Sequence, residues 1–181
     1  MRMTIRPRSW KRRLPLLTAA ALLACLLLAA CGFHLRGTAS LPFETLYLPN
    51  ASGGIALDLK RSIQSGSDTR VLDAPQGAQA QLQFTEETRL KEILALSSAG
   101  RVREFRLVYR VGFRVTDGKG GDFLPLSTVA LTRDVTYDDT VVLAKEAEEQ
   151  LLFREMQADM VQQIMRRIAS AKKPAADAPA R

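Results

Sequence analysis

Apolar and polar residues alternate along several segments in the middle of the chain, and such a period of two predicts β-strands. The clearest alternation begins at Phe105, and turn-forming residues stand before and after this segment, at Ser97–Gly100 and Asp117–Gly121. Including shorter runs of the same kind, we predict strands over 45–48, 80–88, 90–96, 105–115 and 129–137.

In two other segments, apolar residues repeat every three to four positions, which predicts amphipathic helices. The first helix begins near Ile55, carries Leu59 and Ile63 on the same face, and ends near Gly66. The second runs from about residue 141 to 169, and its apolar face carries Leu152, Met156, Met160 (or Val161), Ile164 and Ile168. The candidate N-caps of this second helix are Asp138, Asp139 and Thr140.

The predicted order is strand, helix, four strands and helix, and the short links between the middle strands favour antiparallel pairing. Each strand has one apolar face, so we expect the sheet to be buried on one side only. We therefore predict an α+β fold: a two-layer sandwich with a mostly antiparallel or mixed β-sheet and two amphipathic helices on one face.

The basic excess of the chain lies before this predicted body. The formal net charge is +7, but residues 1–30 hold six of the 26 Lys and Arg residues and none of the 19 acidic ones. The remaining chain therefore has 20 basic and 19 acidic side chains, a net charge of +1. Such a balanced body does not indicate a nucleic-acid partner.

The end of the N-terminal apolar run indicates lipid attachment. Leu28-Ala29-Ala30-Cys31 resembles the bacterial lipobox, in which the cysteine takes a diacylglycerol and becomes the first mature residue. Cys25 matches this pattern less well because of the bulky Leu23. We predict a cleaved lipoprotein signal peptide over 1–30 and lipidation of Cys31, with a retained membrane anchor as the alternative. Gly32 follows, and resemblance to lipoproteins generally implies sorting to the outer membrane.

Residues that could catalyse a reaction are scarce. His34 is the only histidine, and no cysteine follows Cys31. The mature chain therefore offers neither a metal cluster nor a nucleophile–base pair of the Ser/His or Cys/His kind. We predict that the protein is not an enzyme and has no metal site and no cofactor.

Arginines fill the polar face of the clearest predicted strand. Arg106, Arg110 and Arg114 repeat at every fourth residue, so neighbouring guanidinium groups lie about 13 Å apart at roughly 3.3 Å per residue. Arg103 extends this row, and Arg133 lies either near it or on the opposite face. The row is either a solvated face or a surface for phosphates, whose oxygens match arginine forks. In a Gram-negative envelope the abundant phosphorylated partner is lipopolysaccharide (LPS).

Two motifs resemble the LPS-assembly lipoprotein family LptE. The first, Cys31-Gly32-Phe33-His34-Leu35-Arg36-Gly37, is similar to the Cys-Gly-aromatic-His-Leu-Arg start of the mature family chain. The second, Leu-Ala-Lys-Glu-Ala-Glu-Glu-Gln at 143–150, is similar to the opening of the family's last helix. The segments 133–139 and 162–168 add to a resemblance that covers nearly all of residues 31–169.

The resemblance implies a periplasm-facing lipoprotein, without a catalytic site, that is anchored in the outer membrane. Such a protein plugs the large LptD-type β-barrel of the LPS translocon, assists the assembly of that barrel and binds LPS during delivery to the outer leaflet. The family domain spans 31–169, and the Ala, Pro and Lys content of 170–181 predicts a disordered tail. The alternative is a structural lipoprotein that assists barrel assembly without binding LPS.

The resemblance also implies two basic LPS contacts. One matches Lys145 in the second motif. The other falls in the turn before the clearest predicted strand, where this chain has Ser98, with Arg101 and Arg103 nearby as candidate substitutes. Together with the arginine row, the candidate LPS-binding residues are Lys145, Arg101, Arg103, Arg106, Arg110, Arg114 and Arg133.

Overall fold

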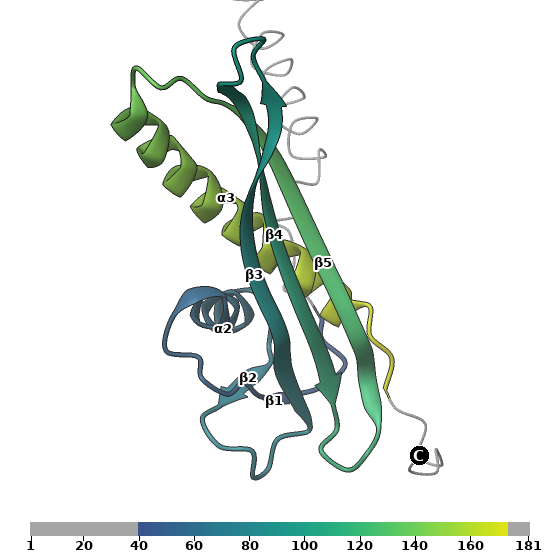
Figure 1. The fold of residues 1–181 in the computed structure, drawn as a ribbon. Helices are drawn as coiled ribbons and strands as arrows, with labels where there is room; N and C mark the ends of the chain where they lie inside the picture. Colours follow the sequence, from purple (N-terminus) through teal and green to yellow (C-terminus); the bar gives the residue numbers. More distant parts are fainter. Residues whose placement is uncertain (1–39, 174–181) are drawn as a thin grey trace, which may run out of the picture. The chain divides into compact units, whose positions relative to one another are not determined.

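A five-stranded sheet with two helices makes up residues 40–173, which are the residues that the computed structural model describes (Figure 1). In chain order the elements are β1 (Thr45–Tyr47), α2 (Gly54–Gly66), β2 (Arg70–Leu72), β3 (Ala80–Leu96), β4 (Val102–Thr116), β5 (Asp122–Thr136) and α3 (Val142–Ala169). The strand order is β2-β1-β3-β4-β5. β1 is parallel to β2 and β3, whereas β3, β4 and β5 are antiparallel. The mixed α+β fold predicted from the sequence is confirmed.

β3 is one long strand where the sequence pattern predicts two. Its register with β4 shifts between Phe84 and Glu86, so that Thr85 forms a β-bulge. The bulge changes which positions face the helices, because Arg89 and Lys91 now pair with helix-facing residues of β4. These positions are charged, so the apolar alternation ends although the strand continues. The sequence pattern also misses β2, since its three residues are too few to show a period.

Gly112 of β4 lies opposite the bulge, and the space around it is too small for a side chain. A Cβ atom at this position would lie 2.7 Å from the Thr85 hydroxyl oxygen and 3.3 Å from the Glu86 Cβ. We expect Gly112→Ala to lower the free energy of unfolding by about 1–3 kcal/mol, as overpacking does in other proteins. Urea denaturation would measure this loss.

Thr85→Ala supplies the control for this prediction. It removes the hydroxyl that the new Cβ would meet, so Gly112→Ala should cost less in the Thr85→Ala background than alone. An equal cost in both backgrounds would contradict the steric explanation.

Both helices bury their apolar faces against the same side of the sheet. From α2 these residues are Ile55, Leu59 and Ile63, as the sequence predicts. α3 crosses behind β4 and β5 in Figure 1. Its fully buried residues are Met156, Met160, Ile164 and Ile168, and they share one core with the alternate β4 positions Leu107, Tyr109, Val111, Phe113 and Val115.

The first half of α3 is attached differently. None of residues 142–155 is buried, and Lys145 and Glu149 occupy sheet-facing positions. The helix follows Val141 and has no side-chain cap, so the capping role predicted for residues 138–140 is wrong. Asp138 instead accepts hydrogen bonds from the N–H and the hydroxyl of Thr140, at 2.9 and 2.7 Å, and closes the turn ahead of the helix.

Candidate functional site

The turn between β3 and β4 and the segment leading into α3 come together at one end of the sheet. The backbone N–H of Tyr137 donates to the Arg103 carbonyl at 2.8 Å, and the Arg101 guanidinium donates to the Asp139 carboxylate at 3.2 Å. We call this region, residues 93–103 and 136–145, the hairpin end. Three of the candidate LPS-binding residues, Arg101, Arg103 and Lys145, belong to it.

The pKa of the Asp138 carboxyl group is lowered at the hairpin end, in part by two of these cations. Hydrogen bonds from the backbone N–H and the hydroxyl of Thr140 lower the pKa of the Asp138 carboxyl, and the charges of Arg103 and Lys145 lower it further. Arg103 and Lys145 therefore act on the same carboxylate from two different elements. Arg103 and Lys145 are 42 residues apart in the chain, so the sequence does not predict that both lie near Asp138.

Lys145 lies against the sheet rather than pointing freely into solvent. Its ammonium donates to the Glu148 carboxylate at 2.8 Å and lies 3.5 Å from the Thr136 hydroxyl oxygen. The side chain is only 19% exposed. It lines a small hollow together with Phe105 and Tyr137. Lys145 thus lies between α3 and β5, and only a small part of its side chain is exposed to a ligand at the hairpin end.

Large apolar side chains are exposed around these cations. Ile93 and Leu96 of β3 are 60% and 58% exposed, and Leu143 at the start of α3 is 82% exposed. Leu94 and Val141 are also exposed. Exposed apolar side chains beside cations suit a ligand that has both anionic groups and hydrocarbon chains.

The arginine row of β4 lies on the opposite face of the sheet, away from the helices. Arg106 donates twice to the Asp134 carboxylate, at 2.8 and 2.9 Å, which raises the pKa of Arg106 and lowers that of Asp134. Arg114 donates to Gln83, and Arg110 has no side-chain partner among residues 40–173. The row is therefore interrupted by local pairs.

Arg133 lies on the helix-facing side of the sheet. Of the two locations that the sequence left open, it therefore occupies the face opposite the arginine row. Its β4 partner is Leu107, a core residue, and its guanidinium donates to Asp159 of α3 at 3.1 Å. Arg133 therefore joins neither the outer row nor the hairpin end.

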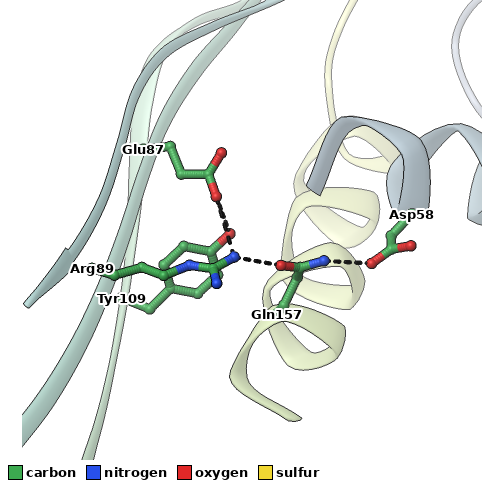
Figure 2. Close-up of polar contacts among 5 residues, drawn as sticks. All are labelled: Asp58, Glu87, Arg89, Tyr109 and Gln157. Carbon is green, nitrogen blue, oxygen red and sulfur yellow. Dashed lines mark hydrogen bonds and ion pairs between the residues drawn. The ribbon is translucent and has the colours of Figure 1, made fainter. Parts of the chain in front are cut away.

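A chain of polar contacts crosses between the sheet and both helices (Figure 2). The Arg89 guanidinium donates to the Gln157 side-chain oxygen at 2.5 Å, and the Gln157 amide donates to Asp58 at 2.5 Å. The Tyr109 hydroxyl donates to Glu87 at 2.8 Å, and Arg89 lies 4.7 Å from the centre of the Tyr109 ring. Burial raises the pKa of Tyr109, so its hydroxyl remains a donor. The sequence did not single out these residues, because their meeting depends on the bulge at Thr85.

A second set of contacts holds the first half of α3 near the hairpin end. The Lys91 ammonium forms an ion pair with Glu149 at 2.5 Å and lies 4.3 Å from the centre of the Phe105 ring. Phe105 in turn packs edge-on against Tyr137, with ring centres 5.1 Å apart. The start of α3 is thus attached through charged and aromatic groups, and Leu152 and Phe153 farther along are partly buried against the core.

The part of the chain that the structure describes has no cluster of three or more His, Cys, Asp or Glu side chains that could hold a metal ion. Neither α2 nor α3 is long and apolar enough to cross a membrane. Cys31, Gly32 and His34, together with the predicted signal peptide, lie outside the described residues. Of the predicted tail, the structure describes residues 170–173.

Comparison with known proteins identifies the family. The model of the family LptE, lipopolysaccharide-assembly, matches residues 43–168. The chain belongs to the LptE family. LPS-assembly lipoproteins LptE from Pectobacterium atrosepticum and Yersinia pestis are 28% and 31% identical to it over 150 and 157 residues. These alignments cover 81% and 84% of this chain and 80% and 75% of the relatives.

Solved structures agree with this membership. An uncharacterized lipoprotein B from Nitrosomonas europaea is 41% identical, with a TM-score of 0.66, over 77% of this chain and 91% of that one. The rare lipoprotein B from Shewanella oneidensis, at 23% identity and a TM-score of 0.60, covers 70% of this chain and 94% of its own, and shows the fold alone. The resemblance to LptE that rests on the two sequence motifs is confirmed, and this chain is a member of a family of LPS-assembly lipoproteins.

Proposed function

We propose that this LptE-family chain is an outer-membrane lipoprotein that plugs the LptD-type β-barrel of the LPS translocon, helps to assemble it, and binds LPS during delivery to the outer leaflet. The signal peptide over 1–30 is removed, and a lipid on Cys31 anchors the domain on the periplasmic side. The domain over 31–169 acts without catalysis and without a cofactor.

The observation that carries LPS binding is the composition of the hairpin end. Arg101, Arg103 and Lys145 lie there beside the exposed side chains of Leu96 and Leu143. LPS combines phosphates with acyl chains, and arginine guanidinium groups bind phosphate oxygens through paired hydrogen bonds. Beside the outer arginine row, Leu90 is 42% exposed, whereas Leu96 and Leu143 at the hairpin end are 58% and 82% exposed. The hairpin end therefore offers LPS acyl chains more exposed apolar surface beside its cations than the outer row does.

The second candidate function is a barrel-assembly chaperone that does not bind LPS. The pairing of the hairpin-end cations favours it, because Arg101 already has Asp139 and Lys145 has Glu148 as partners. In this case, the loss of the protein would remove the barrel, and the isolated domain would have no affinity for LPS.

Direct binding separates the two functions. The buried core lies within residues 43–168, so a chain that begins after Cys31 keeps all of it. We expect this lipid-free domain to bind LPS saturably, measured by retention of the protein on immobilised LPS and by competition with free LPS. The absence of saturable binding by a folded domain would refute LPS binding and leave the chaperone function.

A further inference from the structure

Two strands of the sheet have a long edge without a neighbouring strand, and the two edges differ in charge. β1 pairs with β3 only at Ala80 and Gln81, so the rest of β3 is free on that side. This edge carries a bulge and the charged residues Glu86, Glu87, Arg89, Lys91 and Glu92, which are features that discourage pairing with another strand. β5 is the last strand of the sheet, and no residue from 123 to 132 is charged.

The backbone groups that β5 presents outward follow from its hydrogen bonds. The N–H of Tyr137 donates to Arg103 of the neighbouring chain segment, so the backbone groups of Tyr137 point toward β4. Alternate residues of an antiparallel strand point their N–H and C=O groups to opposite sides. The register with β4 is unbroken from residue 127 to 136. Thr128, Ala130 and Thr132 therefore direct their N–H and C=O groups away from the sheet.

Arginine side chains cover this edge at two of its outward carbonyl groups. Arg167, in the last turn of α3, donates from its guanidinium to the outward carbonyl of Thr128 at 2.9 Å. It occupies the position at which the N–H of a further strand would bind. Arg133 lies 3.5 Å from the outward carbonyl of Thr132 and gives weaker cover. Within residues 40–173, the closest side-chain contact to the outward backbone groups of this uncharged stretch therefore comes from Arg167, an exposed residue.

We propose that the outer edge of β5 is a pairing surface for β5 of a second copy of this chain, and that Arg167 keeps this surface closed in the monomer. Antiparallel pairing about a two-fold axis at Ala130 places Thr128 opposite Thr132 and Val129 opposite Leu131. Arg133 then faces Ser127, and no like charges face each other from 127 to 133. This self-complementarity is the reason for a second copy as the partner, since cross-strand threonine and aliphatic pairs stabilise sheets.

Replacement of Arg167 tests the proposal, and its neighbour provides a matched control. Arg167→Ala and Arg166→Ala remove the same charge from the same exposed helix turn, but the Arg166 side chain makes no hydrogen bond or ion pair within residues 40–173. We expect Arg167→Ala to strengthen dimerisation of the chain after Cys31 by about tenfold or more, measured by sedimentation equilibrium. Arg166→Ala should associate no more strongly than the unaltered chain.

Ala130→Pro tests whether the dimer forms through the outer edge of β5. Proline removes the outward N–H of residue 130, which makes no bond to β4, and edge strands tolerate proline, as Pro125 in the same strand shows. A melting curve verifies that the variant remains folded. The double variant Arg167→Ala with Ala130→Pro should associate no more strongly than the unaltered chain. Equal association of Arg167→Ala and Arg166→Ala, or a dimer that survives Ala130→Pro, would overturn the proposal, and neither result bears on LPS binding.

Discussion

Ile164→Ala in the second half of α3 is expected to lower the free energy of unfolding by about 3 kcal/mol, within the range for deleting a buried aliphatic side chain. Ile164 is fully buried beneath the sheet, together with Met160 and Ile168. The cost includes both the lost apolar burial and the cavity left in a close-packed core. Chemical denaturation of the chain after Cys31 would measure it.

Leu143→Ala in the first turn of the same helix is the matched control. Leu143 is 82% exposed, so its truncation should change the free energy of unfolding by no more than about 0.5 kcal/mol. The contrast tests the division of α3 into a half that carries fully buried residues and a half that carries none. Similar costs at both positions would show that the first half of α3 is packed as tightly as the second.

Reversing the charges of Arg101 and Arg103 together should weaken LPS binding by about tenfold or more, because charge-assisted hydrogen bonds to phosphate become repulsions. Both residues lie at the hairpin end, beside exposed leucine side chains. The double variant Arg101→Glu and Arg103→Glu would be compared with the unaltered domain on immobilised LPS.

A second double variant separates local contact from overall charge. Arg110→Glu with Arg114→Glu changes the net charge equally, but on the face of β4 that points away from the helices. We expect it to bind LPS nearly as well as the unaltered domain. Equal losses in both double variants would indicate attraction by total charge and would remove the hairpin end as the specific site.

The sequence predicts the sheet and helices well where one period is maintained over many residues. In β4 the alternation from Phe105 to Val115 correctly separates the buried positions from Arg106, Arg110 and Arg114. The α3 periodicity correctly identifies Met156 and Ile164 as core residues. These patterns are local consequences of strand and helix geometry, and they need no knowledge of the tertiary fold.

The candidate site is harder to predict because it depends on contacts between distant segments. The bulge at Thr85 turns Arg89 and Lys91 toward the helices, and a period of two cannot anticipate such a reversal. The ion pair between Arg101 and Asp139 forms because the turn between β3 and β4 and the end of β5 lie at the same end of the sheet. The sequence predicts a continuous arginine row, but Asp134 on the neighbouring strand forms an ion pair with Arg106 and interrupts it.

Isolation of the lipidated chain from outer membranes tests whether it forms a complex with a barrel. The membranes would be dissolved in a mild detergent, the protein recovered through a C-terminal affinity tag, and its partners identified and quantified by mass spectrometry. We expect to recover a large outer-membrane β-barrel protein in about equal amount, because one copy of the domain would plug one barrel. Recovery of the folded, lipidated chain without such a barrel would contradict this expectation.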